Sequence, residues 1–382
     1  MSEPSASRSW IALYRRRDRY SSVREAVERV TSHLPWHTYQ HIVVKPNLVS
    51  TTRLLAVTHP DALRAVLDVI RDATDAPITV AEGTATQNTW IAFTRFGYVD
   101  LVRRYSHCCL WDLNTDTPME LIAYNRQWQP MKLQAARTVL DADLVISVGP
   151  PKTHDFVIVT LSIKNLIMGT LISRFAPHRP PPAHLHANKA VRPLPVRALK
   201  VARRAYDALP GWVQALPLFE APRFFFMARE PRSDKFRMHQ SYTLLNLNLF
   251  LMAWQGLVPD VSVLDGWEAM EGDGPTDGTP VPWRVAIAGT DALAVDAFAA
   301  EAMGFHLHDV GYLYYCHQAG LGVGDLRRIH IQGNLTLEDI RYPFRPHRLI
   351  ANQRRWPDPR AMRIVRDIAA GHIMLQRYRS TS

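Results

Sequence analysis

A single stretch of the sequence concentrates side chains that could carry acid–base or nucleophilic chemistry. In KTHDFVIVTLSIKNLIMGT (152–170), Lys152 and Lys164 flank His154. A lysine can anchor a carboxylate or phosphate, or attack a carbonyl carbon when it is partly desolvated. A histidine can transfer a proton near neutral pH or bind a metal. We therefore take Lys152, His154 and Lys164 as candidate catalytic residues.

Each of these residues, taken alone, could equally be solvated surface. Their clustering favours a shared site. The surroundings of Lys164 and Asn165 favour it further, because apolar residues stand on both sides of this pair. A lysine in apolar surroundings needs a partner or a cavity.

Further polar residues would complete a binding crevice. Lys45 and Asn47 close a β-branched run, while Thr58 and His59 open the next predicted helix. A helix amino end presents free backbone donors to an anion. Together with Asn165, these four residues are our candidate substrate-binding residues. For His59 alone, a helix-start role without a ligand is favoured.

Three acidic residues are candidates for holding a divalent metal. Glu82 ends a predicted strand, and Asp265 and Glu271 lie in the glycine-rich stretch DGWEAMEGDGPTDG (265–278). Carboxylate oxygens suit hard cations such as Mg²⁺. The spacing matches no calcium-binding loop, so two other roles stay open. Glu82 could form a structural ion pair, and the acidic stretch could neutralise the lysines.

Alternating strands and helices would bring these residues together. The apolar runs at 41–47, 78–83 and 143–148 are typical of buried parallel strands. Between the first two, apolar residues recur at helical spacing after Thr58 and Pro60, which predicts a capped helix. Ligands of open α/β sheets bind outside the carboxyl ends of the strands, where these polar residues stand.

A second α/β stretch follows in the latter half of the chain. We expect helices over about 238–255 and 291–304, and strands at 261–266, 283–290 and 328–333. The predicted fold class is α/β, with mostly parallel sheets, flanking helices and two lobes. The predicted divisions are an N-terminal lobe with the Lys/His loop (1–173), a basic proline-rich insertion (174–237), a second lobe (238–345) and a basic, partly helical C-terminal tail (346–382).

The insertion carries most of the excess positive charge. The 382 residues have a formal net charge of +10, and 13 basic and 4 acidic residues lie between Arg174 and His239. Ten prolines in 174–237 argue against a compact βαβ unit. Basic and aromatic residues interleave in RFFFMAR (223–229), as they do where proteins contact anionic membranes or single-stranded nucleic acid. The favoured alternative is a lid whose phenylalanines are core.

Cysteine content and apolar patterning exclude several classes of protein. With 3 cysteines the chain has no disulfide framework and no spacing for an iron–sulfur cluster. The longest apolar region, 244–264, is interrupted by polar residues and falls short of the ~20 apolar residues of a membrane span. The first residues lack the apolar core of a signal peptide, so we expect a cytoplasmic protein.

Seven motifs form an ordered pattern along the chain: VVKPN (43–47), THPDALRAVL (58–67), EG (82–83), ADLVISVGPPKTH (142–154), TLSIKNLIMG (160–169), LDGWEAMEGDGP (264–275) and AGTDALAVDAFAAEAMG (288–304). The pattern resembles the family catalogued as domain of unknown function 362. Many members of that family carry a ferredoxin-like cysteine motif or an export signal. This chain has neither, so the resemblance implies no electron transfer through an iron–sulfur cluster.

A more distant similarity runs to the nickel-pincer lactate racemase family. Its members also place a histidine and then a lysine after an aspartate-led strand, as Asp143, His154 and Lys164 stand here. The glycine-rich surroundings of that family's lysine are absent, which argues against a pincer cofactor. The similarity implies a crevice in which lysine and histidine act as ligands or acid–base groups.

We therefore predict an enzyme that binds a small anionic metabolite, a carboxylate or a phosphate, in a crevice between two lobes. Lys152 and Lys164 would anchor the anion and His154 would transfer a proton. Glu82 or Asp265 would balance charge or hold a divalent metal. The alternative is a binding or docking protein whose basic aromatic insertion contacts an anionic membrane, nucleic acid or an acidic partner.

Overall fold

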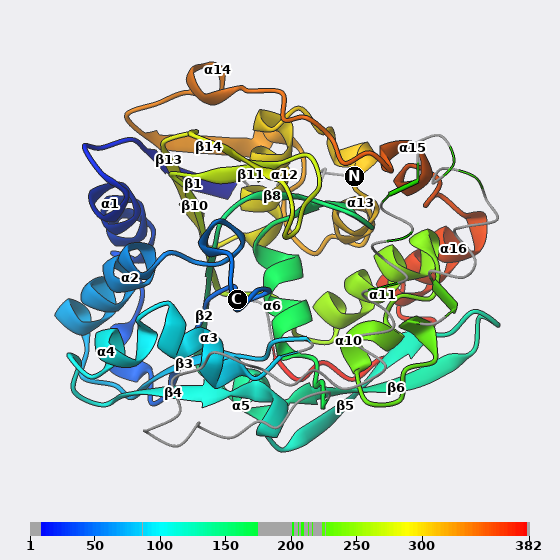
Figure 1. Cartoon of the computed structure of the whole chain (residues 1–382), viewed down its shortest axis with the longest axis horizontal. Coiled ribbons are helices and arrows are strands. Elements are labelled where there is room, and N and C mark those ends of the chain that lie inside the picture. Colours follow the sequence, from blue (N-terminus) through cyan, green and yellow to red (C-terminus); the bar gives the residue numbers. More distant parts are fainter. Residues whose placement is uncertain are drawn as a thin grey trace, which may run out of the picture.

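The fold is built on an eight-stranded sheet in the order β14-β1-β13-β10-β7-β2-β3-β4 (Figure 1). The structure is a computed structural model. It describes residues 9–85, 87–174 and 227–379, together with isolated residues between 201 and 225. The strands of this sheet are β1 (Ser9–Tyr14), β2 (Ile42–Lys45), β3 (Ile78–Glu82), β4 (Cys108–Asp112), β7 (Leu144–Gly149), β10 (Val261–Gly266), β13 (Val285–Gly289) and β14 (Ile329–Gly333).

The strand order changes direction between β2 and β7. From β2 the chain proceeds through β3 to β4 on one side, whereas β7 pairs with the other side of β2 and leads on to β10. All these neighbours are parallel, and β13 runs antiparallel to both β10 and β1. Ligands of open α/β sheets bind at the carboxyl ends of the two strands that flank such a change of direction.

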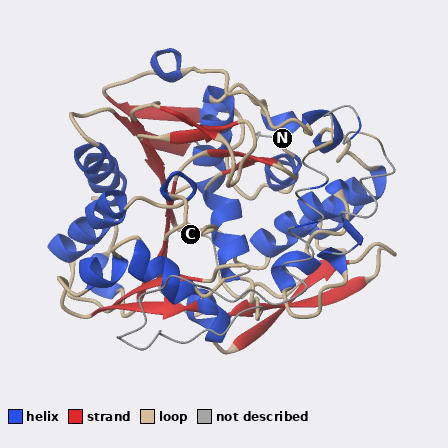
Figure 2. Ribbon diagram, in the orientation of Figure 1, coloured by secondary structure: helices blue, strands red, loops and turns tan. Residues whose placement is uncertain are grey.

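Helices cover both faces of the sheet (Figure 2). The helices are α1 (Arg19–Thr31), α2 (Pro60–Ala73), α3 (Thr89–Arg95), α4 (Tyr98–Val102), α5 (Arg137–Leu140), α6 (Ser162–Thr170), α10 (Asp234–Arg237), α11 (Tyr242–Trp254), α12 (Ala292–Ala302), α13 (Gly311–Gln318), α14 (Leu337–Ile340), α15 (Ile350–Gln353) and α16 (Pro359–Ala369).

Two hydrophobic cores lie on opposite faces, because successive side chains of a strand point to opposite sides. In β2, Ile42 and Val44 pack in the core beneath α1, α2 and α4, whereas Val43 packs in the core beneath α6, α11, α12 and α13. Helix α2 leaves β2 toward the first face and α6 follows β7 on the second. The two connections therefore diverge at the switch between β2 and β7.

The predicted α/β class with mostly parallel strands and flanking helices is confirmed. The strands expected at 41–47, 78–83 and 143–148 are β2, β3 and β7, and the helix expected to begin near Pro60 is α2. The strands assigned to the two lobes join in one sheet, because β7 pairs directly with β10 and the N-terminal β1 lies between β13 and β14.

Two smaller sheets complete the fold. Their strands are β5 (Pro118–Tyr124) with β6 (Pro130–Ala136), and β8 (Lys152–His154), β9 (Ile158–Thr160), β11 (Ala269–Glu271) and β12 (Thr279–Val281). The amides of Asn248 and Gln255 donate to and accept from the backbone of β5 at distances of 2.8–3.0 Å. These polar residues in and just after the buried helix α11 therefore serve to hold the hairpin.

The segment predicted as an insertion leaves and re-enters the body at neighbouring points. Ser173 forms a backbone bridge with Ser233, and the Asp234 N–H donates to the Ile172 carbonyl at 3.0 Å. Most of the residues between these points lie outside the described part of the chain. Within the described residues, no helix is long and apolar enough to cross a membrane.

Helix α6 is capped by a carboxylate from another helix. Asp296 of α12 accepts hydrogen bonds from the Ser162 N–H (2.9 Å), the Ser162 hydroxyl (2.6 Å) and the Ile163 N–H (3.0 Å). Burial raises the pKa of Asp296 to about 7. Because the first N–H groups of a helix have no partner within it, this carboxylate fixes where α6 begins.

We expect Asp296→Ala to lower the free energy of unfolding by roughly 2–4 kcal/mol, since it leaves buried donors of Ser162 and Ile163 without an acceptor. Denaturant unfolding followed by circular dichroism measures the change. The matched control is Asp325→Ala, which removes a cap from an exposed turn and should cost no more than about 1 kcal/mol. Equal losses in both variants would contradict the assignment.

Candidate functional site

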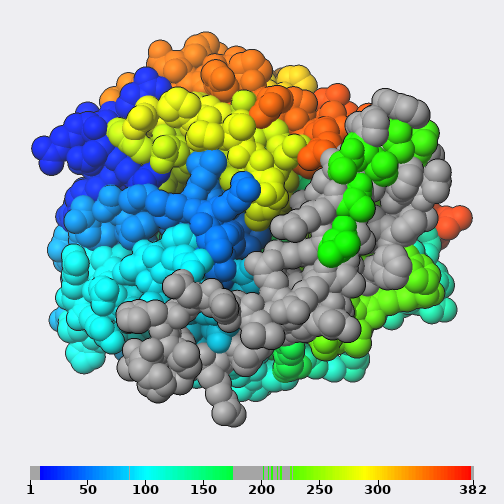
Figure 3. All heavy atoms as spheres, viewed as in Figure 1, coloured from blue at the N-terminus to red at the C-terminus, as the bar shows by residue number. Residues whose placement is uncertain are grey.

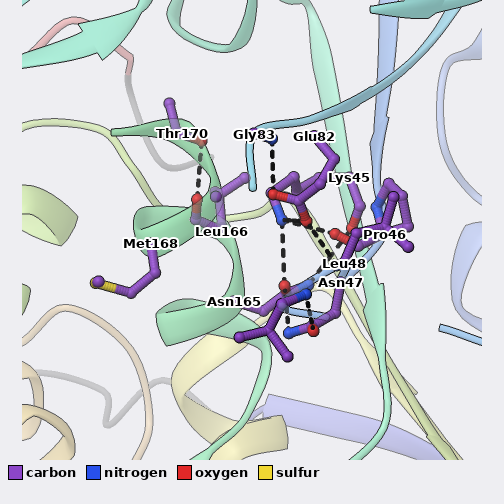
Figure 4. Close-up of polar contacts among 12 residues, drawn as sticks. Lys45, Pro46, Asn47, Leu48, Glu82, Gly83, Asn165, Leu166, Met168 and Thr170 are labelled. Carbon is purple, nitrogen blue, oxygen red and sulfur yellow. Dashed lines mark hydrogen bonds and ion pairs between the residues drawn. The ribbon is translucent and has the colours of Figure 1, made fainter. Parts of the chain in front are cut away.

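A buried ion pair joins the carboxyl ends of β2 and β3. The Lys45 ammonium donates to Glu82 Oε2 (2.6 Å), to the Pro46 carbonyl (2.6 Å) and to Asn165 Oδ1 (3.2 Å), so all three of its hydrogens have acceptors (Figure 4). Both members of the pair are buried. Burial lowers the pKa of Lys45, and the Glu82 carboxylate acts against this.

Helix α6 approaches this pair so closely that one position on it must be glycine. A Cβ atom at Gly169 would overlap Lys45 Cε and Nζ and Glu82 Oε1. Glu82 also accepts from the backbone N–H groups of Leu48 (3.0 Å) and Gly83 (2.8 Å). The carboxylate is thus held by backbone as well as by the ammonium, which makes this corner of the site rigid.

Asn165 links the two strands that flank the switch. Its Oδ1 accepts from Lys45 and from Asn47 Nδ2 (2.9 Å), and its Nδ2 donates to the Ser147 hydroxyl at 3.0 Å. Lys45 and Ser147 are register partners on β2 and β7. The predicted site residues Lys45, Asn47 and Asn165 therefore come together at the switch point.

Lys152 is a second buried lysine, and it stands on a strand rather than in the predicted loop. Its Nζ donates to the Ala56 carbonyl (2.6 Å) and to Asn47 Oδ1 (3.1 Å). Burial, helped by the positive charge of Lys164, holds its pKa well below the ordinary range. Because side chains alternate along β8, Lys152 and His154 share a face.

The loop that carries Ala56 also reaches the acidic stretch. Arg53 donates to the Thr276 carbonyl at 3.0 Å and forms an ion pair with Asp277 at 3.1 Å. Figure 3 shows the loop near residue 50, in blue, lying against the yellow surface of the second half of the chain. This contact helps to hold the Ala56 carbonyl over Lys152.

His154 and Lys164 form a direct pair. The distance from His154 Nε2 to Lys164 Nζ is 3.0 Å, and His154 Nδ1 accepts from the Phe156 N–H at 3.0 Å. Asp155 Oδ1 lies 3.3 Å from the same Nδ1. Burial lowers the pKa of Lys164 to about 8, while burial and the neighbouring Lys164 hold the pKa of His154 well below its ordinary value.

A fourth buried lysine was missed by the sequence analysis. Lys235 donates to the carbonyls of Gly83 (2.8 Å), Met168 (2.7 Å) and Gly169 (3.0 Å), two of which end helix α6. Burial lowers its pKa to about 7, and the three carbonyl oxygens favour the ammonium form. Lys235 lies at the end of a segment rich in basic residues, so nothing in the sequence distinguished it from its neighbours.

Four lysines are therefore buried around the carboxyl ends of β2, β3 and β7. In the described part of the chain, Glu82 is the one carboxylate within hydrogen-bonding distance of any of their ammonium groups. Moving an ammonium out of water is costly unless an opposite charge or several acceptors compensate. Glu82 compensates Lys45 directly, whereas the charge of Asp155, which lies beside His154, acts on Lys164 without a direct contact.

Thr58 and His59 each make structural contacts, and their contact with a substrate stays a prediction. Thr58 Oγ1 accepts from the Asn47 N–H (2.8 Å) and donates to the Val148 carbonyl (2.7 Å), which ties β2 to β7. His59 Nδ1 accepts from the Asp61 N–H at 3.1 Å and caps α2. The favoured reading of His59 as a helix-start residue agrees with this geometry.

The three carboxylates predicted to hold a metal are not brought together. Glu82 pairs with Lys45, and Asp265 pairs with Arg19 at 3.1 Å. Glu271 accepts from the Arg345 N–H at 2.9 Å. Among the described residues, no group of three or more histidine, cysteine, aspartate or glutamate side chains is placed to bind a metal ion. Each acid has a cationic partner instead, since the Arg345 guanidinium also lies 3.9 Å from Glu271.

The basic aromatic motif of the insertion lies only partly in the described residues. Phe224 is buried against Phe156, with ring centroids 5.2 Å apart, as expected for a core residue. The Arg229 guanidinium stacks on Phe225, whose exposure is 39%. Arg223 and Phe226 lie outside the described residues. A docking role for this motif stays a prediction.

Comparisons with known proteins agree with the motif pattern. A family model described as "Domain of unknown function (DUF362)" matches residues 42–301. No curated protein matches the chain. Among solved structures, the lactate racemase apoprotein from Thermoanaerobacterium thermosaccharolyticum is similar, with 20% sequence identity and a TM-score of 0.30. That match covers 45% of this chain and 41% of the racemase chain.

We expect Lys45→Met and Glu82→Gln each to lower the free energy of unfolding by roughly 3–5 kcal/mol, because each leaves a buried partner uncompensated. The double variant should recover much of this loss, since it removes both charges. Denaturant unfolding of the four proteins forms the double-mutant cycle. Additive losses would show that the two side chains do not interact.

Removing the Lys164 charge should stabilise the protein in a pH-dependent way. The pKa of Lys164 is about 8 in the folded chain against an ordinary 10.5, so its burial penalty is complete below about pH 8 and disappears as the pH approaches 10.5. We expect Lys164→Met to raise the free energy of unfolding by up to about 3 kcal/mol at about pH 6, and by little at about pH 10.

Denaturant unfolding at the two pH values checks this expectation. The control is Lys132→Met, because Lys132 is an exposed lysine that pairs with Glu120 at 2.6 Å. A Lys164→Met variant that is less stable than the parent at both pH values would show that the Lys164 ammonium is compensated in the folded state.

Proposed function

The chain belongs to the DUF362 family, and we propose that it is an enzyme that binds a small carboxylate- or phosphate-bearing metabolite beside Lys164 and His154. The observation that supports this most directly is that two buried lysines of the cluster lack a carboxylate partner. Lys152 and Lys164 have no carboxylate within hydrogen-bonding distance in the described part of the chain. An anionic ligand would supply the missing charge.

A bound anion would compensate the cost of burying lysine side chains. Lysines buried without an opposite charge destabilise the fold, so Lys152 and Lys164, which have no carboxylate contact among the described residues, are expected to serve something other than stability. A bound anion regains part of the lost solvation energy through short contacts in a medium of low dielectric constant. Strongly shifted pKa values gathered in one place are themselves typical of functional sites.

The position of the cluster supports the same conclusion. Lys45 lies at the carboxyl end of β2, opposite Ser147 of β7, where ligands of open α/β sheets bind. Lys164 and His154 lie on α6 and β8. Both keep 5% of their surface exposed. We assign the contact with the ligand to this pair.

The residues divide into two roles under this proposal. Lys45 and Lys235 hold the ends of β2, β3 and α6 and contribute positive potential, because their hydrogens are already accepted. Lys164 contacts the anion, Lys152 adds a polarising amine behind it, and His154 transfers a proton to or from the ligand. A proton donor and a cation side by side suit reactions in which charge develops on a carbonyl or phosphoryl oxygen.

We expect a panel of small carboxylates and phosphates to contain ligands that raise the melting temperature of the parent protein. At a ligand concentration about a hundredfold above Kd, binding stabilises the folded state by about 3 kcal/mol. The same ligand should have little effect on Lys164→Met and should act fully on Lys132→Met. Differential scanning fluorimetry, followed by calorimetric titration of any hit, makes the measurement.

The pH dependence provides a second criterion for the same ligands. The Lys164 ammonium is present below about pH 8 and is lost above it, so affinity should fall by up to about tenfold per pH unit beyond that point. A hit whose affinity is equal in the parent and in Lys164→Met, or rises above pH 8, would argue against the assigned contact. A panel without any hit would argue against the proposed function.

A further inference from the structure

The four buried lysines differ in how many acceptors their Nζ atoms have. Lys45 and Lys235 each donate to three acceptors, which accounts for every hydrogen of an ammonium group. Lys152 donates to two oxygens and is fully buried. Lys164 is the exception, because its Nζ faces a histidine ring nitrogen and its side chain keeps some exposure.

The hydrogen bonds of His154 favour one tautomer of its ring, and that tautomer favours a neutral amine at Lys164. The Phe156 N–H points to Nδ1, so that nitrogen must carry a lone pair and the ring proton resides on Nε2. An N–H at Nε2 needs an acceptor, and the atom in front of it is Lys164 Nζ. An ammonium group has no lone pair to offer, whereas a neutral amine has one. This arrangement therefore suits a neutral amine at Lys164.

When Lys164 is protonated, the hydrogen bonds between Lys164 and His154 change. As an ammonium group Lys164 donates to Nε2, and the ring proton moves to Nδ1. Nδ1 then gives up the hydrogen bond from the Phe156 N–H and faces Asp155 Oδ1, 3.3 Å away. The pair can therefore alternate between an anion-binding cation and a nucleophilic amine. The titratable groups whose charges act on the pair are Asp155, Lys152, His239 and His347.

We propose that Lys164 forms a Schiff base with a small aldehyde or 2-oxo acid. This inference rests on the proposed function, since it assigns the ligand class of the same site. A neutral lysine that is largely buried, as Lys164 is, is the nucleophile that such chemistry requires. Lys152, the buried lysine whose charge interacts with that of Lys164, would attract the carboxylate of a 2-oxo acid when it is protonated.

The reaction needs no oxidant or reductant. The lone pair of Lys164 Nζ forms a bond to the carbonyl carbon, and the C=O π electrons move to oxygen. His154 donates its Nε2 proton to the oxygen and then takes a proton from the nitrogen onto Nε2, which yields a neutral carbinolamine. A second transfer of the same kind releases the oxygen as water while the nitrogen lone pair forms C=N. The products are the imine and one water molecule.

Reductive trapping with pyruvate tests the proposal. The full-length protein is incubated with pyruvate and sodium cyanoborohydride, and intact-mass measurement and peptide mapping locate the secondary amine. We expect the adduct on Lys164, formed on the order of tenfold faster than on any exposed lysine. The rate should rise with pH up to about 8 and then level off, as the neutral amine becomes the main form.

Matched variants and a matched acid complete the experiment. Lys132→Met should be labelled like the parent, and Lys164→Met should lose the adduct. Because the site is located by peptide mapping of the parent protein, the result does not depend on the folding of a variant. His154→Gln should slow the labelling of Lys164 and alter its pH profile, whereas a residue with only a packing role would leave that profile unchanged.

Propionate, which has the carboxylate but no carbonyl carbon beside it, separates this inference from the proposed function. An adduct on Lys164 supports the Schiff base. Labelling spread over exposed lysines, or no labelling while propionate or another anion stabilises the parent in a Lys164-dependent way, overturns the Schiff base and leaves anion binding standing. No labelling together with no stabilising anion overturns both.

Discussion

The need to compensate the Lys45 ammonium shapes the centre of this molecule. A lysine at the carboxyl end of a buried strand has no access to water, so every hydrogen must find an acceptor inside the protein. Glu82 at the end of the neighbouring strand, the Pro46 carbonyl and the Asn165 amide supply them. Helix α6 must then approach closely enough to bring Asn165 into place, and a glycine at position 169 permits that approach.

The same constraint explains why the remaining lysines are placed as they are. Once α6 is fixed against β2 and β3, its last carbonyls point to Lys235, and its first turn sets Lys164 against His154. Asp296 fixes the start of the helix. One nine-residue helix thus meets a carboxylate at its amino end, an ion pair at its side and an ammonium at its carboxyl end, an arrangement that complements its dipole.

Much of the strand arrangement and part of the candidate site could be predicted from the sequence. Short β-branched runs indicated β2, β3 and β7, and polar residues at their ends predicted where Lys45, Asn47 and Asn165 meet. The pairing partners could not be predicted in the same way. Glu82 and Asp265 were assigned to one possible metal site, because a sequence does not show that Lys45 and Arg19 lie closer to them. Lys235 was missed because it stands among polar and charged neighbours, as an exposed lysine does.

The position of β1 in the sheet affects the order in which the chain folds. The first strand lies between β13 and β14, whose residues follow it by more than two hundred and fifty positions; Ile11, for instance, is opposite Gly289 and Ile331. Such distant pairing closes a very long loop and is slow to form. During synthesis the amino-terminal strand has no partner until nearly all of the chain has left the ribosome, whereas β2, β3 and β4 can already associate. We therefore expect the site-bearing half of the sheet to assemble first and the N-terminal strand to complete the fold.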